Sequence, residues 1–284
     1  MTSSIQSTGT HGAGRNVPLL PAIGLTVVAL VVLGAIFAPL LVSNQPADLV
    51  DSAYAPPGST LLGTDVLGRD LFSRLLFGAR LTLLVAFGST TIGFALGCLW
   101  GLAAAELGGW FDDLTDWIVN IVLAFPPLML GLLLVSALAP SLAILIGALA
   151  AIQLPRVVRV ARAIGQNVSS LQFVEVARAR GEGLFSVLYR EILPNILRPL
   201  AAEYGLRVTY ATLFISGLSF LGLGIQPPDA DWGGLVRENM SAMQIGSMLP
   251  VLAPACAIGV FAVAMNLVID WIDESTFERQ MSND

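Results

Sequence analysis

Six runs of mostly apolar residues, each about 20 residues long or longer, dominate this sequence of 284 residues. The hydrocarbon core of a bilayer is about 30 Å thick, and a helix of about 20 residues crosses it. Charged residues make up only 12% of the chain, against about 25% in a typical soluble domain. The sequence therefore predicts an all-α integral membrane protein with six transmembrane helices. The expected spans are 19–42, 79–105, 117–138, 141–163, 201–224 and 247–271.

The rest of the chain is short and is predicted to hold no soluble domain. Residues 1–17 are polar and rich in Ser, Thr and Gly, which predicts a disordered tail. The first apolar run exceeds the 7–15 residues of a signal-peptide core, so we expect it to stay in the protein. We assign one membrane domain to 18–273 and a C-terminal tail to 274–284. The longest segments between spans are too short for an independent core.

Arginine placement predicts the orientation in the membrane. All 14 basic residues are arginines, and half of them fall around the connection between the fourth and fifth runs. Positively charged connections face the cytoplasm. Both termini are then cytoplasmic, whereas segments 43–78 and 225–246 are extracellular. The expected inner loop 106–116 has acidic residues but no arginine, and acidic residues contribute little to this rule. The seven arginines are Arg156, Arg159, Arg162, Arg178, Arg180, Arg190 and Arg198.

The composition excludes most enzyme classes. A Walker A phosphate loop needs a lysine, and the chain has none. The single histidine, His11, lies in the polar tail, so a catalytic triad or a multi-histidine metal site has nothing to be built from. Cys98 and Cys256 fall in apolar runs and are expected to be inert thiols. We expect no catalytic, cofactor or metal site in this chain.

The connection between the fourth and fifth runs differs in character from the rest. Ser169 with Gln172 three residues later is a capping-box pattern, which predicts a short helix. Gly181 falls where such a helix would end in a left-handed turn. A second short helix is expected over 184–192 and should end before Pro194. From arginine content alone, the segment is equally a basic loop that only sets the topology.

The same connection resembles the cytoplasmic signature of ABC importer permeases. That signature reads Glu-Ala-Ala, three residues, Gly, nine residues, Ile, any residue, Leu-Pro. This chain keeps the spacing, but Val176 replaces the second alanine and Glu191 replaces the isoleucine. The resemblance implies that 165–200 is a coupling loop that inserts into a groove on an ATPase subunit. The implied coupling residues are Glu175, Ala177, Arg178, Gly181, Leu193 and Pro194.

Two further stretches are similar to one subfamily, the second permease of dipeptide and oligopeptide importers. They are Leu-Gly-Thr-Asp-Val-Leu-Gly-Arg-Asp-Leu-Phe-Ser-Arg at 62–74, and residues 218–228 with Trp-Gly at 232–233. The resemblance covers about 60–280. It implies a type I ABC importer permease fold that forms half of a path for peptides in a prokaryotic cell membrane. The implied partners are a sister permease, two ATPases or a fused pair that bind ATP and Mg, and an extracellular substrate-binding protein. No nucleic acid is implied.

Four charged residues after the first span have helical spacing. Asp65, Arg69, Asp70 and Arg74 are four or five residues apart, which predicts a helix with paired charges on the outer face. One interpretation is a solvated amphipathic helix that anchors the segment. The other is a docking surface for the substrate-binding protein.

Polar residues inside the spans are functional candidates by default. Glu203 and Arg207 lie one helical turn apart in the fifth run, which predicts an ion pair, either structural or part of a gate. Ser216 and Ser219 belong to a row of small residues that either packs closely against another helix or lines the path. Pro126-Pro127 interrupts the third run and is expected to bend it.

Two other classes of membrane protein remain as alternatives. An ion-coupled secondary transporter or channel that acts alone needs ionisable groups near mid-membrane. Apart from Glu203, which lies near an end of the fifth run with Arg207, no span carries an acidic residue deep in its run. An intramembrane enzyme lacks the histidine, lysine or paired mid-span aspartates that its chemistry would require.

Overall fold

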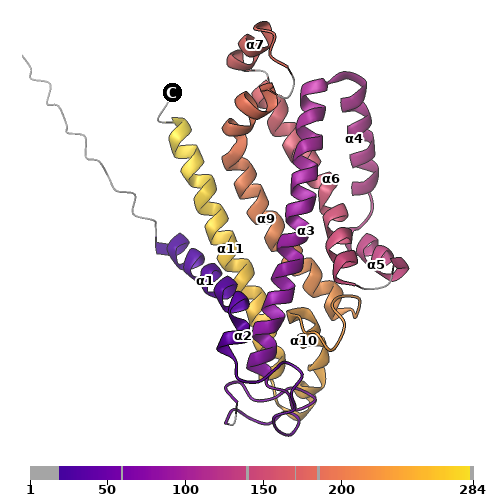
Figure 1. Cartoon of the computed structure of the whole chain (residues 1–284), viewed down its shortest axis with the longest axis vertical. Coiled ribbons are helices and arrows are strands. Elements are labelled where there is room, and N and C mark those ends of the chain that lie inside the picture. Colours follow the sequence, from indigo (N-terminus) through magenta and orange to yellow (C-terminus); the bar gives the residue numbers. More distant parts are fainter. Residues whose placement is uncertain (1–18, 59, 139–140, 170, 184–185, 282–284) are drawn as a thin grey trace, which may run out of the picture.

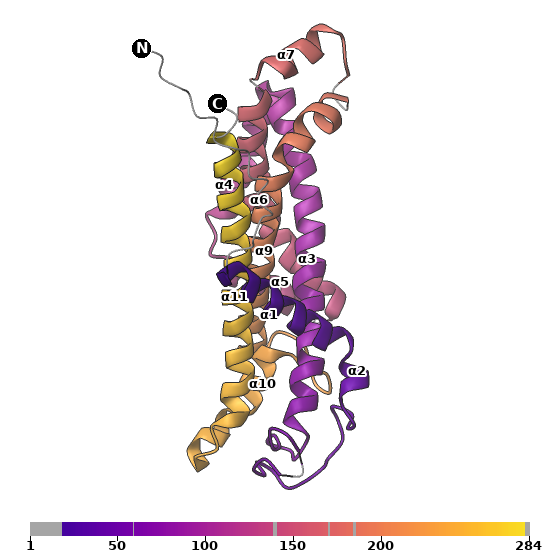
Figure 2. The same ribbon diagram turned by 90° about the vertical axis from the view of Figure 1, so that its left-hand side faces the viewer.

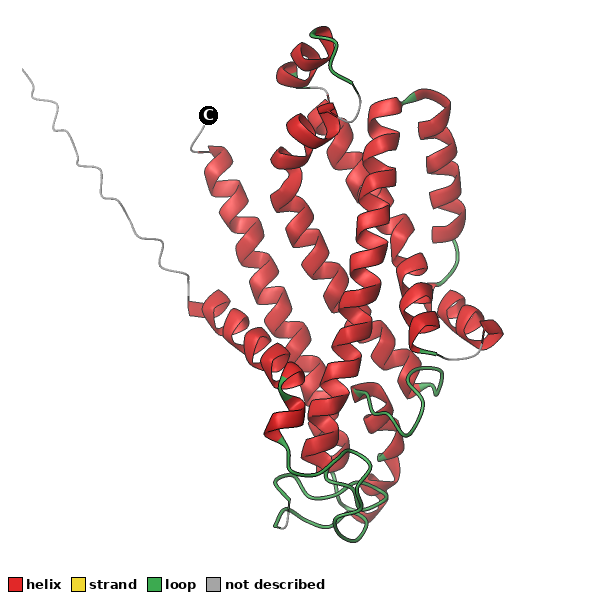
Figure 3. Ribbon diagram, viewed as in Figure 1, coloured by secondary structure: helices red, strands yellow, loops and turns green. Residues whose placement is uncertain are grey.

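The computed structural model describes residues 19–281 except 59, 139–140, 170 and 184–185. The predicted tail 1–17 and the end of the C-terminal tail lie outside the described residues. Helices make up most of the described chain, and no strand occurs among these residues beyond two isolated bridges, Leu49 with Arg69 and Thr64 with Asp70. Figure 3 shows this helical bundle, with an irregular segment at one end. The prediction of an all-α chain is confirmed for the described part.

Most of the long helices run along the length of the bundle, whereas α1 crosses it obliquely (Figures 1 and 2). In Figure 1, α7 lies at the upper end, whereas α10 and the segment between α2 and α3 lie at the lower end; we call these the α7 end and the α10 end. The helices are α1 Leu19–Ile36, α2 Ala38–Leu41, α3 Leu71–Leu107, α4 Gly109–Leu123, α5 Pro127–Leu138, α6 Leu142–Ser169, α7 Gln172–Ala179, a π-helix Val187–Ile192, α9 Leu193–Phe220, α10 Trp232–Glu238, a 3-10 helix Met240–Ile245 and α11 Leu249–Met281.

Four of the described helices are long and apolar enough to cross a membrane. They are α1, α3, α6 and α11, and the count becomes five if the bent pair of α4 and α5 is one span. The helix α9 has 28 residues but is not among them, because polar and charged side chains interrupt its apolar face. The described helices thus give four or five candidate spans by length and composition, and the predicted number of six is not confirmed by this criterion.

The break in the third predicted span is confirmed. The helices α4 and α5 meet at an angle of 83°, and residues 124–126 separate them. Pro127 is the first residue of α5, a position at which the missing N–H of proline costs nothing.

Several predicted boundaries are wrong. The second span was expected to start at 79, but Asp70 caps α3 by accepting a hydrogen bond from the Phe72 N–H (3.1 Å), so the helix begins at Leu71. The expected inner loop 106–116 is only a tight turn, because Gly108 and Gly109 reverse the chain with φ of +61° and +56°. The helix α11 continues into the predicted C-terminal tail and ends at Met281.

Close packing of α3 on α6 forms the centre of the bundle. Gly93, Gly97 and Gly101 lie one turn apart on α3 and face α6. A Cβ atom at Gly97 would lie 2.7 Å from Val157 Cβ, and one at Gly101 would lie 2.5 Å from the carbonyl oxygen of residue 158. Small residues at this spacing allow the backbones of membrane helices to approach closely. The sequence analysis did not identify this Gly-xxx-Gly-xxx-Gly row.

We therefore expect Gly97→Val to destabilise the bundle. The added side chain would overlap Val157, and overpacking typically costs about 1–3 kcal/mol. The control is Gly147→Val on α6, because a Cβ at Gly147 meets no atom within 4 Å. Thermal unfolding in detergent, followed by tryptophan fluorescence, should show a lower Tm for the first variant only. Equal Tm values would contradict the proposed close contact.

Candidate coupling loop and buried charge cluster

The α7 loop, defined as residues 171–192, contains a short helix that ends in a left-handed turn. Gly181 has φ of +78°, and the Glu182 N–H donates back to the Ala177 carbonyl (3.3 Å). This six-to-one hydrogen bond with a left-handed glycine is a Schellman ending. The Glu182 carboxylate then accepts hydrogen bonds from Arg180 (3.0 Å) and the Ser186 hydroxyl (2.9 Å). The prediction of a helix that ends at Gly181 is confirmed.

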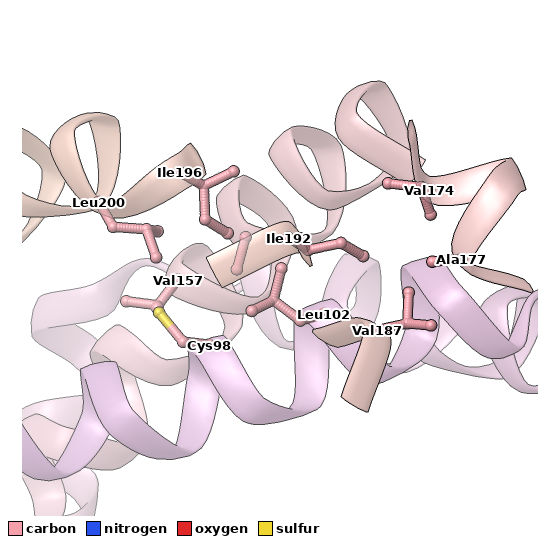
Figure 4. Packing of buried hydrophobic residues seen from close by; sticks show 10 residues of the cluster. Cys98, Leu102, Val157, Val174, Ala177, Val187, Ile192, Ile196 and Leu200 are labelled. Carbon is pink, nitrogen blue, oxygen red and sulfur yellow. The ribbon is translucent and has the colours of Figure 1, made fainter. Parts of the chain in front are cut away.

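One side of the α7 loop packs on the ends of the long helices. Val174 and Ala177 are fully buried, and they join a cluster that includes Leu102 of α3 and Ile192 (Figure 4). In Figure 4 the side chains from α7 and from the start of α9 converge over those of α3. Since both flanks of the loop share this cluster, α7 is fixed to α3, α6 and α9.

Other apolar side chains of the α7 loop are exposed. Val176 of α7 has 54% of its surface exposed, and Leu171, the residue before α7, has 45%. An apolar side chain in this position costs free energy in water and favours contact with a partner. Val176 is also the residue that departs from the alanine of the permease signature.

The structure places the predicted coupling residues in one loop but with different surroundings. Ala177 is buried, Leu193 is partly buried against the cluster, and Gly181 and Pro194 are exposed. The backbones of Glu175 and Arg178 belong to α7, but their side chains lie outside the described part of the structure.

Two local predictions in this loop are wrong. Ser169 is the last residue of α6 rather than the cap of α7. The second short helix does not end before Pro194, because the π-helix Val187–Ile192 continues directly into α9. Proline lacks an N–H donor and crowds the preceding turn. A widened π turn before Pro194 accommodates the ring without ending the helix.

Acidic residues of α4 neutralise arginine at the α7 end. The Arg162 guanidinium of α6 pairs with Asp112 and, through Nη1, with Asp116 (2.9 Å). Arg159 donates to Asn120 of the same helix α4 (2.6 Å). These contacts explain why an inner turn with acidic residues and no arginine is compatible with the predicted orientation. The helix α6 ends at Ser169, so Arg156, Arg159 and Arg162 belong to α6 itself and not to the connection after it.

The motif at 62–74 folds into a compact loop before α3. Gly63 and Gly68 have φ of +76° and +81°, and a Cβ at either would lie within 2.3 Å of a backbone carbonyl oxygen. The Thr64 hydroxyl donates to the Ser52 carbonyl and accepts from the Ala55 N–H, both at 2.7 Å. The glycines and the threonine of the motif are therefore required by the backbone of this loop.

The charged residues of the motif form a buried cluster with α10. Asp65 accepts from Arg69 (2.7 Å) and from Arg74 (2.6 Å). Glu238 accepts from the same two guanidinium groups at 2.9 Å and 2.7 Å. Asp65 and Arg74 have fully buried side chains. We call Asp65, Arg69, Arg74 and Glu238 the charge cluster.

The charge cluster joins chain segments that are distant in sequence. Next to it, the Asn239 side chain accepts from the Val66 N–H (3.0 Å) and donates to the Leu235 carbonyl (2.9 Å). Burial alone would raise the pKa of Asp65, but the backbone amides of residues 69 and 67 and the Arg74 guanidinium outweigh it, so the pKa lies below its usual range. Glu238 and Asn239 could not be predicted as partners of the motif at 62–74, because helical spacing does not report contacts between residues so distant in sequence.

The prediction of a helix that carries all four motif charges is wrong. Asp65 and Arg69 lie in the loop, Asp70 caps α3, and only Arg74 is inside a helix. The Asp70 carboxylate accepts from the Ser73 hydroxyl at 2.6 Å. All four side chains are buried, so they support the surface of the α10 end rather than form it. A docking role for this end stays a prediction.

Asp231 caps α10 in a buried position. Its Oδ2 accepts from the Gly233 N–H (3.2 Å). Burial raises the pKa of Asp231 to about 6, although the Ser219 hydroxyl and the amides of Gly233 and Gly234 act in the opposite direction. A Cβ at Gly233 would lie 2.0 Å from the Ser216 carbonyl oxygen, so α10 lies directly against α9.

The polar residues of α9 are mostly engaged within the chain. Glu203 and Arg207 form an ion pair one turn apart and are largely buried, which confirms the predicted pair and favours its structural interpretation. Ser216 and Ser219 are buried beneath α10 and the segment before it. The Ser216 hydroxyl donates to the Thr212 carbonyl (2.8 Å). Close packing therefore accounts for both serines in this conformation, and a gate or path role for these four residues stays a prediction.

These features together define a class of protein: a helical, multi-span membrane component with a loop packed on the helix ends at one end and a buried charge cluster at the other. The family model described as binding-protein-dependent transport system inner membrane component matches residues 93–278. The chain belongs to this family, whose members are the non-catalytic permease subunits of ABC importers.

Named relatives match most of the chain. A putative peptide transport system permease protein of Brucella suis is 36% identical over 250 residues, which is 87% of this chain and 84% of that protein. A dipeptide transport system permease protein of Alkalihalophilus pseudofirmus is 33% identical and covers 93% of this chain and 87% of its own length. A glutathione transport system permease protein of Pectobacterium atrosepticum is 32% identical, with coverage of 78% and 73%. The protein is thus the membrane-spanning permease subunit of an ATP-driven importer.

We expect Arg74→Met to destabilise the α10 end strongly. The variant leaves buried carboxylates without one of their two cations, and breaking a buried pair costs about 3–5 kcal/mol. Arg237→Met is the matched control, since Arg237 is an exposed residue next to Glu238 on the same helix, and surface changes are usually within about 0.5 kcal/mol. Thermal unfolding in detergent should separate the two variants. A similar Tm for both would show that the cluster contributes no stability.

The raised pKa of Asp231 predicts a pH dependence of stability. The carboxyl group binds its proton more tightly when folded, with a pKa of about 6 against 3.8 unfolded. The wild type should therefore lose stability as pH rises from about 4 to about 6, on the order of 2–3 kcal/mol, and change no further above that window. Asp231→Asn keeps the cap and removes the titration. The Tm difference between wild type and variant, measured from pH 4 to 8, should follow this course; a difference that does not vary with pH would contradict the assignment.

Proposed function

We propose that this permease carries small peptides and that the α7 loop couples it to ATPase subunits. The observation that carries the coupling role is the two-sided packing of α7. Val174 and Ala177 fix the helix to α3, α6 and α9, whereas Leu171 and Val176 present apolar surface outward. A loop built in this way transmits a push or pull from a docked partner to three long helices.

The peptide cargo is supported by the relatives and by the motif at 62–74. Two of the three relatives described above are named for peptide or dipeptide transport. The motif residues that resemble the dipeptide and oligopeptide subfamily form one folded unit with α10 rather than a scattered likeness. This unit supports the α10 end as the face that receives a substrate-binding protein.

The proposed assembly contains this chain, a sister permease and two ATPases or a fused pair, which bind ATP and Mg. This chain would form half of the translocation path. The alternation of long helices between the two ends supports six crossings, with α9 as the crossing that is too polar to meet a membrane-span criterion alone (Figure 1). A helix that faces protein and a water-filled path needs less apolar surface than one that faces lipid.

We propose that the α7 end faces the cytoplasm, together with both termini, in the inner membrane of a prokaryote. Arg159, Arg162, Arg180, Arg190 and Arg198 lie in the inner part of α6, in the α7 loop and at the start of α9, as the positive-inside rule requires. The α10 end then receives cargo from outside.

The coupling role is tested by changing the turn after α7. Gly181→Val forces a β-branched residue into the left-handed region, where such residues are strained, whereas Gly181→Asn suits this conformation. No described atom lies within 4 Å of a Cβ at this position, so the two variants differ in backbone preference rather than in packing. We expect Gly181→Val to lose bound ATPases and Gly181→Asn to keep them.

The measurement is mass spectrometry of the proteins that co-purify with the tagged permease in mild detergent. A second permease and ATPases that carry a Walker A motif should accompany the wild type and the asparagine variant. If the valine variant retains the ATPases at the wild-type ratio and keeps full transport, the geometry of this turn has no coupling role. If the wild-type chain purifies alone and still moves solute, it acts as a secondary transporter.

A further inference from the structure

Arg156 lies at membrane depth on α6. It is near the middle of a helix of 28 residues, roughly 21 Å from the first residue of that helix at 1.5 Å per residue. The candidate span Leu142–Val168 includes it. An arginine at this depth is costly unless it faces protein or a water-filled cavity, and it is a functional candidate by default.

Among the described residues, no polar partner is found for Arg156, in contrast to Arg159, Arg162 and Arg207. Arg207 pairs with Glu203, Arg162 pairs with two carboxylates of α4, and Arg159 donates to Asn120. In the described chain, the contact found for Arg156 is with an aromatic ring: its guanidinium carbon lies 5.3 Å from the centre of the Tyr210 ring on α9. A cation–π contact fixes the plane of the guanidinium and leaves its N–H groups available.

Tyr210 places this arginine beside an open face of α9. Tyr210 is 48% exposed, and Leu206 and Leu213, one turn before and after it, are 38% and 47% exposed. This face belongs to the helix that is too polar for the apolar-span criterion. A charged group beside it points to contact with water rather than with lipid.

We propose that Arg156, oriented by Tyr210, binds the C-terminal carboxylate of the peptide in the translocation path. This inference rests on the proposed peptide cargo. Peptides of different sequence share few groups, and the terminal carboxylate is one of them. Guanidinium binds carboxylate through two parallel hydrogen bonds, which suits a site that must accept varied side chains.

The test is transport by the whole complex in proteoliposomes, with a dipeptide and its C-terminal amide as cargo. The ratio of variant to wild-type rate is taken for each cargo, so any preference of the substrate-binding protein itself cancels. Arg156→Gln should lower the ratio for the free dipeptide about 10- to 100-fold, the range of a hydrogen bond to a charged group, and lower the ratio for the amide much less. Arg156→Lys should recover part of the loss. Arg159→Gln, three residues away on the same helix, should show no such selectivity.

Equal losses for the dipeptide and the amide in Arg156→Gln would overturn the proposal, and so would an unchanged rate for both. If the wild-type complex imports an anionic solute but no peptide, the proposed cargo is wrong, and the carboxylate assignment falls with it. The two kinds of failure are distinguishable. A wrong cargo shows in the wild-type complex, whereas a wrong role for Arg156 shows only in the variant.

A labelling experiment tests the site without relying on transport. In a Cys98→Ala, Cys256→Ala background, Arg156→Cys should react with a charged, membrane-impermeant methanethiosulfonate reagent. The control is Val263→Cys on α11, which is 61% exposed in the isolated chain but lies on an apolar face expected to contact lipid. If position 156 is as unreactive as position 263, it does not line a water-filled path, and the proposal is wrong.

Discussion

The contact between α3 and α6 governs the geometry at both ends of the bundle. The row of glycines at 93, 97 and 101 brings the two backbones together over about two turns. The helix α3 has 37 residues and extends beyond this contact in both directions. Its first turn carries Arg74 of the charge cluster, and its last third contributes Leu102 to the cluster beneath α7. A helix of this length spans roughly 55 Å. One rigid element therefore connects the surface proposed to receive cargo with the loop proposed to receive the ATPase.

Most of the buried arginines described above pair with carboxylates, and Arg156 is the exception. At the α10 end, two arginines meet two carboxylates in a cluster that water barely reaches. At the α7 end, Arg162 meets two carboxylates of α4. Removing a charge from water costs free energy, and the attraction of an opposite charge offsets that cost for each of these groups. Arg156 recovers it only in part through Tyr210, so its remaining hydrogen-bonding capacity is available to something outside the chain.

The class of fold and the local structure around Gly181 could be predicted from the sequence because both depend on local signals. Apolar runs of membrane length, the prolines at 126 and 127, and Gly181 act within a few residues of themselves, and the structure shows a helical bundle, a break and a left-handed turn at these positions. The partners of Asp65 and Arg74 were not predictable in this way. Helical spacing suggested a helix, but Glu238 lies 164 residues from Arg74, and no single-sequence pattern reports such a contact.

Arginine content alone was also a poor guide to where a helix ends. The arginines at 156, 159 and 162 were assigned to a cytoplasmic connection, yet α6 continues through all three and ends at Ser169. The positive-inside rule applies to connections and span ends, which include Arg159 and Arg162 near the α7 end of α6, but it does not apply to Arg156 near the middle of that helix. The prediction that a helix ends before Pro194 was wrong as well, because a proline need not end a helix when the preceding turn can widen. The π-helix at Val187–Ile192 widens that turn, so the backbone is helical from Val187 through α9 to Phe220. Val174 and Ala177 of α7 pack in the same cluster as Ile192. The proposed displacement of α7 would therefore reach α9, including Tyr210, through this side-chain packing and then along continuous helical backbone.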